Sequence, residues 1–189
     1  NVFLIDPFFG KAAISRLLFR LQNSLIDCEI LTSFSNIAPV SANSKSNSEI
    51  INELKMFCSD YRLLLPSGIS IRNLKRGQSG NEQAFHDRYL CLKKKSSDVL
   101  VYLLSNSLNA ASAKYPFCIS KLDIGASREI YYYIKSLSEG KDPSDSHVEL
   151  SIEEVWNPPS SSFNESESDE EKNWIFYFSH LKQFLSWFF

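Results

Sequence analysis

The chain has 189 residues, of which 43% are hydrophobic and 13% aromatic, and its formal net charge is -2. This length and apolar content predict one folded domain with a substantial core and exclude an intrinsically disordered chain. The segment from Arg72 to Lys95 nevertheless has seven bases against two acids, whereas residues 139–171 have eleven acids against one base. The basic segment favours an anionic ligand, although a basic surface loop would have the same composition.

The N-terminal part of the chain alternates short apolar runs with a helical pattern. Residues 2–5 form a continuous apolar run that ends at Asp6-Pro7, which predicts a buried strand stopped by proline. Residues 11–25 have apolar side chains at the period of an amphipathic helix, and residues 28–32 form a second strand-like run. A strand, a helix and a strand in this order favour a parallel pair.

The next part predicts a larger sheet with two more helices. A loop rich in Ser and Asn precedes the first of these helices, and a polar loop and a hairpin turn separate the strands that follow. The predicted elements are the loop 33–48, the helix 49–61, strands at 67–74, 84–93, 99–104 and 117–121, the helix 127–138 and one edge strand within 144–159. We therefore expect an α/β domain over residues 1–159, with a mixed central β-sheet flanked by helices.

Two segments follow this domain. Residues 160–172 are rich in Ser and acidic residues and are predicted to form an acidic linker. Residues 173–189 are predicted to form a C-terminal amphipathic helix with a large aromatic face, because apolar side chains recur every three or four residues. We expect this helix to dock on its own domain or on a partner, since its polar face lacks the Lys and Arg typical of membrane binding.

The four cysteines form no CxxC pair and have no histidine at ligand spacing, so we expect no metal site and no cofactor. Cys28, Cys91 and Cys118 lie in strand-like runs and are predicted to be buried free thiols, which favours a cytoplasmic setting. No apolar stretch has the length of a membrane span, so no membrane contact is expected. Because Asn1 leads straight into a strand, we expect the chain to be a domain of a longer polypeptide.

The sequence His86-Asp87-Arg88 is the strongest candidate for chemistry. In an extended strand, a histidine and a cation two residues apart point to the same side. The imidazole can attack phosphorus or transfer a proton, and the guanidinium can hold phosphoryl oxygens. A strand with two solvated polar side chains would have the same local pattern. After one hairpin, the segment from Ser105 to Asn109 is expected to bring hydroxyl and amide groups beside the histidine.

At these residues the chain resembles the phospholipase D-like superfamily, whose motif is H-x-K, then an Asp, then G-S-x-x-N at the end of the next strand. His86 matches the histidine, Arg88 replaces the lysine and Asn109 falls at the asparagine. Ser105 and Asn106 stand at the Gly-Ser positions. The stretches 5–8 and 117–123 also resemble single-copy bacterial members, and the resemblance covers about residues 1–140.

The resemblance implies half of a phospholipase D-like fold and a metal-independent phosphodiesterase or nuclease. His86 would form a phospho-histidine intermediate, and Arg88 and Asn109 would hold the phosphoryl oxygens. Because this family pairs two motifs and the chain has one, the resemblance implies a homodimer. Nucleic acid is the expected partner, with DNA favoured over RNA, and by analogy the role would be bacterial defence against foreign DNA.

Departures from the motif support an alternative, a catalytically degenerate interaction module of a larger protein. Lys93 stands where the motif has Asp, and Ser105 replaces its Gly. If the site is intact, further substrate-binding residues are expected around it, with a basic rim that also includes Lys75, Lys94 and Lys95. These residues are Ser105, Asn106, Ser107, Lys121, Lys93 and Arg76. Asp6, at the end of the first strand, could serve the site or cap the following turn.

Overall fold

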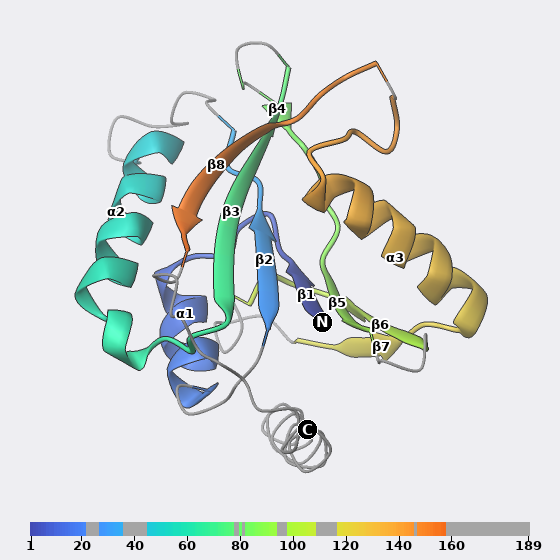
Figure 1. The fold of residues 1–189 in the computed structure, drawn as a ribbon, viewed down its shortest axis with the longest axis horizontal. Coiled ribbons are helices and arrows are strands. Elements are labelled where there is room, and N and C mark those ends of the chain that lie inside the picture. The colour runs from blue at the N-terminus through green and yellow to red at the C-terminus, as the bar shows by residue number, and fades with distance from the viewer. Residues whose placement is uncertain are drawn as a thin grey trace, which may run out of the picture.

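A computed structural model describes residues 1–21, 27–35, 45–77, 80, 82–93, 98–108, 117–145 and 147–157 (Figure 1). In chain order the elements are β1 (Val2–Ile5), α1 (Lys11–Leu17), η1 (Leu18–Leu21), β2 (Cys28–Thr32), α2 (Asn47–Asp60), η2 (Arg62–Leu64), β3 (Ile69–Arg76), β4 (Glu82–Gln83), β5 (Tyr89–Lys93), β6 (Val99–Leu104), β7 (Ile119–Lys121), α3 (Ile124–Ser138) and β8 (Ser151–Trp156).

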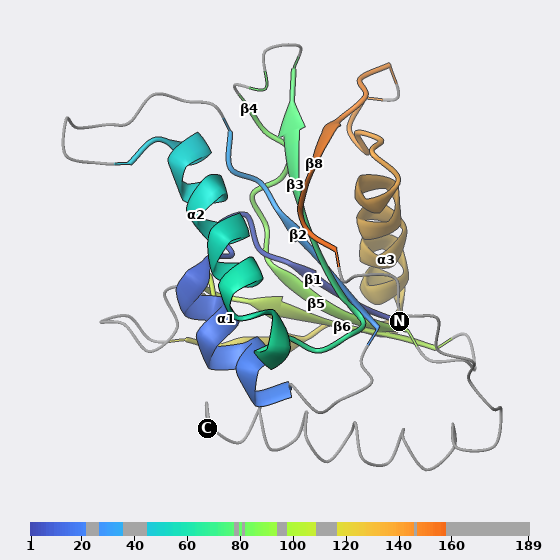
Figure 2. The same ribbon diagram turned by 60° about the vertical axis from the view of Figure 1, so that its left-hand side comes forward.

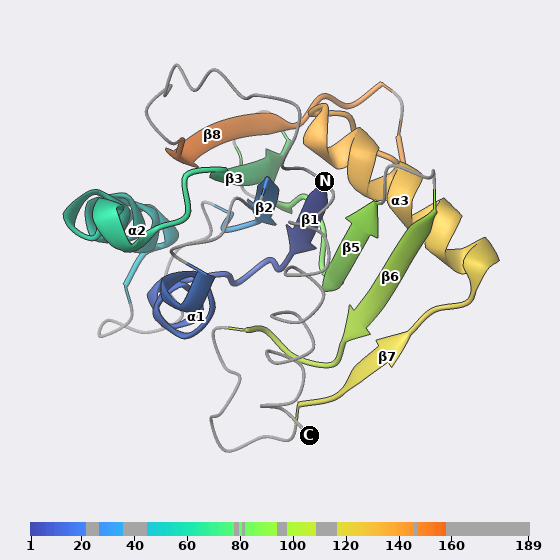
Figure 3. The same ribbon diagram turned by 60° about the horizontal axis from the view of Figure 1, so that its bottom comes forward.

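One mixed sheet contains all the described strands, in the order β4-β3-β2-β1-β5-β6-β7, with β8 also paired to β3 (Figure 3). Strands β1, β2 and β3 are parallel, whereas β5 is antiparallel to β1, and β6 and β7 continue as antiparallel neighbours. Strands β2 and β3 are thus added on one side of β1, and β5, β6 and β7 are added on its other side. The carboxyl end of β1 is therefore the point where the strand order reverses, which is where open α/β sheets commonly bind ligands.

Helices cover both faces of the sheet, with α1 and α2 on one face and α3 on the other (Figure 2). Alternation along β1 divides its side chains between two cores. Leu4 packs in the core that contains Ile14 and Leu54, whereas Phe3 and Ile5 pack in the core that contains α3. This arrangement confirms the predicted α/β class, a mixed central sheet flanked by helices.

Capping residues explain why two helices begin earlier than their apolar periods predict. Ser46 and Glu49 form a reciprocal capping box, so α2 begins at Asn47 rather than at residue 49. The carboxylate of Asp123 accepts hydrogen bonds from the backbone N–H groups of Gly125 and Ala126, so α3 begins at Ile124 rather than at residue 127. The first predicted helix was too long, because α1 ends at Leu17 and a 3-10 turn continues to Leu21.

The predicted strand at 84–93 was wrong in its first half. β5 begins at Tyr89, which pairs with Ile5, the last residue of β1. Beyond Ile5, β1 ends and its backbone turns through Asp6 and Pro7. Residues 85–88 therefore have no strand beside them on the β1 side. His86 and Arg88 therefore precede the strand, and the argument that they share one face of it does not hold.

The C-terminal predictions differ in outcome. The expected edge strand is confirmed as β8, which lies antiparallel to β3. The acidic linker 160–172 and the amphipathic helix 173–189 lie outside the described residues. Within the part of the chain that the structure describes, no helix combines the length and apolar character needed to cross a membrane.

Three of the four cysteines are buried free thiols, but they are not the three that the sequence predicts. Cys28 and Cys91 are buried as expected, Cys58 on α2 is buried as well, and Cys118 is exposed. Cys118 precedes the short edge strand β7, so no further strand covers it. Burial raises the pKa of each of Cys28, Cys58 and Cys91 to about 12, which keeps these thiols protonated and unreactive at neutral pH.

We expect one fast-reacting thiol per folded chain toward Ellman's reagent at pH 8, because Cys118 is exposed whereas Cys28, Cys58 and Cys91 are buried. The other three thiols should react only as fast as the protein opens, and all four should react in denaturant. Cys118→Ser should remove the fast phase. Two or more fast thiols in the parent protein, or a fast phase that survives Cys118→Ser, would contradict the described core.

Candidate functional site

The strand directions bring three separate segments together at the carboxyl end of β1, which is one edge of the sheet. Because β5 is antiparallel to β1, its beginning lies at the carboxyl end of β1, and Tyr89 pairs with Ile5. Because β6 is antiparallel to β5, its end lies at the same edge, where the Leu104 N–H donates to the Arg88 carbonyl oxygen at 3.0 Å. The segment that contains His86 and the loop after β6 therefore adjoin Asp6, as the sequence predicts for that loop and the histidine.

Asp6 is the centre of this edge and is completely buried. Its Oδ2 accepts hydrogen bonds from Ser107 Oγ at 2.8 Å and from the Leu108 N–H at 2.7 Å. Its Oδ1 accepts from the Phe8 N–H at 3.1 Å and lies 3.8 Å from Arg88 Nε. One carboxylate thus fixes the turn after β1, the loop after β6 and the arginine before β5. The sequence allows Asp6 either a role in the site or a role in capping the following turn. The contacts show that Asp6 does both, since it caps the turn at Phe8 and holds Arg88 and the loop after β6.

Burial raises the pKa of Asp6 above its ordinary value, because the carboxylate is removed from water. The hydrogen bonds from Ser107, Phe8 and Leu108 oppose this effect, and the charge of Arg88 opposes it further. A buried carboxylate is tolerated only when donors and a cation surround it, so these contacts depend on one another.

Arg88 is held on two sides. Its Nε faces Asp6, and its guanidinium carbon lies 5.7 Å from the centroid of the Phe8 ring, in a cation–π arrangement. The Nε atom is buried, but 3.8 Å is too long for a hydrogen bond to Asp6, and no other hydrogen-bond partner reaches Nε. The guanidinium is therefore oriented by the charge of Asp6 and by the Phe8 ring, not by a hydrogen bond at Nε.

His86 is exposed, unlike Arg88, whose side chain is largely covered. The intervening Asp87 is exposed and accepts a hydrogen bond from Tyr89 Oη at 3.3 Å. Burial, together with the Asp87 carboxylate, raises the pKa of Tyr89 to about 12, so the phenol remains a neutral donor. His86 is thus accessible at the edge where the charged and hydroxyl groups meet.

The loop after β6 is fixed by its own hydrogen bonds. Ser105 Oγ accepts from the Cys118 N–H at 2.7 Å, and Asn106 Oδ1 accepts from the Ser107 N–H at 2.9 Å. Ser107 itself donates to Asp6, so it is a buried structural hydroxyl rather than a free ligand. Asn109, the third predicted catalytic residue, lies outside the described residues.

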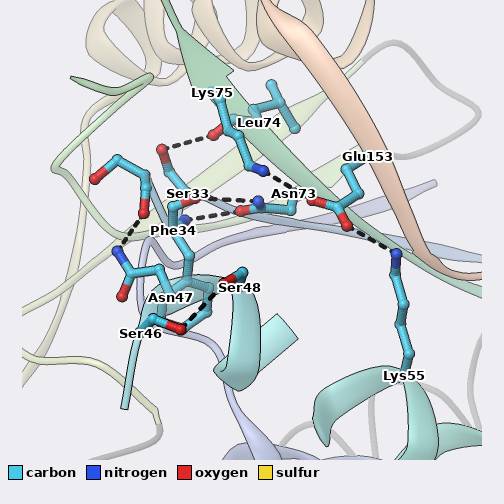
Figure 4. Close-up of polar contacts among 11 residues, drawn as sticks. Ser33, Phe34, Ser46, Asn47, Ser48, Lys55, Asn73, Leu74, Lys75 and Glu153 are labelled. Carbon is cyan, nitrogen blue, oxygen red and sulfur yellow. Dashed lines mark hydrogen bonds and ion pairs between the residues drawn. The ribbon is translucent and has the colours of Figure 1, made fainter. Parts of the chain in front are cut away.

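The neighbouring end of β2 is filled by a buried polar network (Figure 4). Asn73 Oδ1 accepts from the Phe34 N–H at 2.7 Å, and its amide donates to the Phe34 carbonyl oxygen at 3.1 Å. Ser33 Oγ donates to the Leu74 carbonyl oxygen and accepts from the Ala84 N–H. The groups on this side of β1 satisfy one another, so the chemically accessible side is the one that carries His86.

The described members of the predicted basic rim do not gather around Asp6. Lys93 lies at the opposite end of β5, because Leu92 pairs with Val2, and its Nζ donates to Tyr131 Oη at 3.0 Å. Lys121 is exposed on the edge strand β7, where it pairs with Tyr102 rather than with the end of β6.

Two more predicted cations are on β3 and already have partners. Arg76 is paired with the buried Asp142, and Lys75 Nζ lies 3.0 Å from Glu153 Oε2 (Figure 4). Lys94 and Lys95 lie outside the described residues. The sequence signal of a basic segment thus consists partly of cations that pair with acids far along the chain, which composition cannot reveal.

No group of three or more His, Cys, Asp or Glu side chains that could hold a metal ion is found in the described part of the chain. His147 is exposed near the end of that part, and His180 lies outside it. The sequence indicates Asp6 only as a possible site residue, and it does not single out Phe8. The signal for Asp6 was an acid directly after a buried strand, whereas nothing in the sequence distinguishes Phe8 from the buried Phe9 beside it.

A scan of the chain against models of protein families finds no match, and a search of curated proteins finds no relative.

We expect Asp6 and Arg88 to be energetically coupled. Asp6→Asn should lower the free energy of unfolding by about 1–3 kcal/mol, because one amide oxygen cannot serve the donors that now share two carboxylate oxygens. Arg88→Gln should cost less in Asp6→Asn than in the parent protein, which urea denaturation of the double-mutant cycle would measure.

Asp142→Asn provides a matched control, because Asp142 is also buried, bonded to a serine and paired with an arginine. Its effect should add to that of Arg88→Gln, since the two residues share no partner. An additive Asp6–Arg88 cycle would contradict the coupling.

Proposed function

We propose that this chain is a phospholipase D-like phosphodiesterase domain that acts on nucleic acid, with His86 as the nucleophile. The observation that carries the proposal is that the exposed His86 stands two residues before Arg88, which is anchored by the buried carboxylate of Asp6. Both lie at the reversal point of the strand order, the commonest ligand position in open α/β sheets.

The chemistry follows from the groups present. An imidazole nitrogen of His86 would attack phosphorus, forming a P–N bond while the P–O bond to the leaving oxygen breaks. The guanidinium of Arg88 would stabilise the charge that develops on the non-bridging oxygens. Water would then cleave the P–N bond and regenerate the histidine. The leaving oxygen needs a proton, which a second histidine would supply in this mechanism.

The second histidine is expected to be His86 of another copy of the chain, because neither His147 nor His180 is followed two residues later by a lysine or arginine in the sequence. This requires a two-fold dimer with the two sites at its axis. Light scattering on the purified protein should then give twice the mass of one chain at assay concentrations. A strict monomer that still cleaves phosphodiesters would overturn the paired mechanism and require another proton donor.

We expect nuclease activity that persists in excess EDTA, since the donor set at this edge suits phosphoryl oxygens rather than a cation. His86→Ala should abolish it because the nucleophile is lost. Arg88→Ala should lower kcat by roughly two to four orders of magnitude, whereas Arg88→Lys should be partly active because lysine keeps the charge. Single-turnover cleavage of labelled single- and double-stranded DNA would measure these effects.

Lys121→Ala is a suitable control, because this exposed lysine lies on β7 away from the anchored arginine. It should leave the cleavage rate unchanged. Activity that requires magnesium, or that survives His86→Ala, would refute the mechanism.

One observation favours the second candidate, an interaction module without catalysis. Lys93 occupies the position of the motif's Asp and is engaged by Tyr131 at the far end of β5. Complete inactivity of the parent protein on DNA, RNA and simple phosphodiesters would favour this alternative. For the phosphodiesterase, we propose a cytoplasmic setting and nucleic acid as the binding partner.

A further inference from the structure

Phe8 is the only phenylalanine among the described residues whose side chain is exposed, with 41% of its surface accessible. Its neighbour Phe9 is completely buried. An exposed ring forgoes part of the hydrophobic stabilisation that burial would give it, so its exposure beside a candidate site points to a ligand.

Phe8 is also held firmly at this position. Its N–H donates to Asp6 Oδ1 at 3.1 Å, and its carbonyl oxygen lies 3.4 Å from Ser107 Oγ as a hydrogen-bond acceptor. The ring meets Phe34 edge to face, with the centroids 6.2 Å apart and the planes at 69°. The backbone of Phe8 is therefore fixed by the buried carboxylate of Asp6 and by Ser107, and its ring is held by Phe34, so a ligand would not have to order this side chain.

The ring and the guanidinium form one composite surface, since Arg88 lies 5.7 Å from the Phe8 centroid. Proteins that bind single-stranded nucleic acid combine a cation for the phosphate with an aromatic ring for the base, and arginine adds to such stacking. A base within a duplex is stacked between its neighbours and cannot lie on a protein ring unless it is unpaired or flipped out. A phosphate at Arg88 would place the base of an adjoining nucleotide within reach of Phe8.

We infer that Phe8 is a base-stacking specificity residue and that the site takes unpaired nucleotides. The inference rests on the proposed function and deepens it, because it selects single-stranded over double-stranded nucleic acid as the ligand. The stacking surface accepts any base, so little sequence preference is expected.

The test uses fluorescence anisotropy with three labelled probes: a 20-nucleotide oligo-dT, an abasic strand of equal length and a duplex that contains oligo-dT. Parent protein should bind oligo-dT more tightly than either other probe. Phe8→Ala should weaken oligo-dT binding by about 5- to 100-fold, which corresponds to the loss of one stacked base. The same variant should weaken abasic and duplex binding far less, because those probes lose only the ring's contribution to the orientation of Arg88, and Phe8→Trp should retain oligo-dT binding. Oligo-rU in place of oligo-dT compares RNA with DNA.

Tyr132→Ala is the matched control, since Tyr132 is an exposed aromatic residue on α3, away from the Asp6 edge. It should not change binding of any probe. Phe8→Ala that weakens abasic and oligo-dT binding equally would overturn the stacking role, because the ring would then act only by orienting Arg88. An unchanged affinity for oligo-dT would overturn it as well.

Binding of the abasic strand by the parent protein measures the proposed phosphodiester site alone if Arg88→Ala removes that binding. If this Arg88-dependent binding is found but Phe8→Ala does not weaken oligo-dT binding, only the stacking inference falls. If no probe binds the parent protein, the proposed function and the stacking inference both fall.

Discussion

The buried carboxylate of Asp6 is the constraint on which the rest of this edge depends. A charge removed from water must be matched by donors and by a cation, and the protein supplies them from three segments. Two of those segments are more than 80 residues away in sequence and reach Asp6 only because β5 and β6 continue the sheet antiparallel to β1. The sheet topology and the candidate site are therefore one arrangement, because a change of either would leave the carboxylate unmatched.

The two sides of β1 use polar residues in opposite ways. On the β2 side, Ser33 and Asn73 are buried and fully occupied with backbone groups, so they hold the strand ends together (Figure 4). On the β5 side, His86 and Phe8 are exposed, while Asp6 and Ser107 beneath them are buried. The exposed His86 and Phe8 are thus supported by buried, hydrogen-bonded residues, as is usual for a site that must not reorganise when it binds a ligand.

Much of this architecture could be predicted from the sequence because apolar periodicity is a local signal. The runs at β1, β2 and β6 were placed at their observed bounds, since each is a short and mostly apolar segment. The error at 84–93 was of another kind. Residues 85–88 adjoin the apolar run of β5, but whether they pair depends on the length of β1, which ends at Ile5.

The candidate site was predictable to a similar degree. The proximity of His86 to the loop after β6 followed from one hairpin, which is short-range topology. That Lys75 and Arg76 would be neutralised by Glu153 and Asp142 did not follow, because those contacts span more than 60 residues. Composition counts charges, whereas only the fold shows which of them are already paired.

This pairing of charges bears on how nucleic acid would be held. Each phosphate contact made by a cation adds to the salt dependence of binding, and the cations of β3 are engaged within the protein. The described part of the edge offers Arg88 as its anchored cation, next to an exposed ring and an exposed histidine. Such a site would contact few phosphates, so recognition would depend on the geometry of one phosphodiester and its neighbouring base rather than on a basic groove. Recognition of one phosphodiester and its neighbouring base suits a flexible single strand, which can present both groups together. It suits a duplex less well, because the bases of a duplex are stacked away from the phosphates.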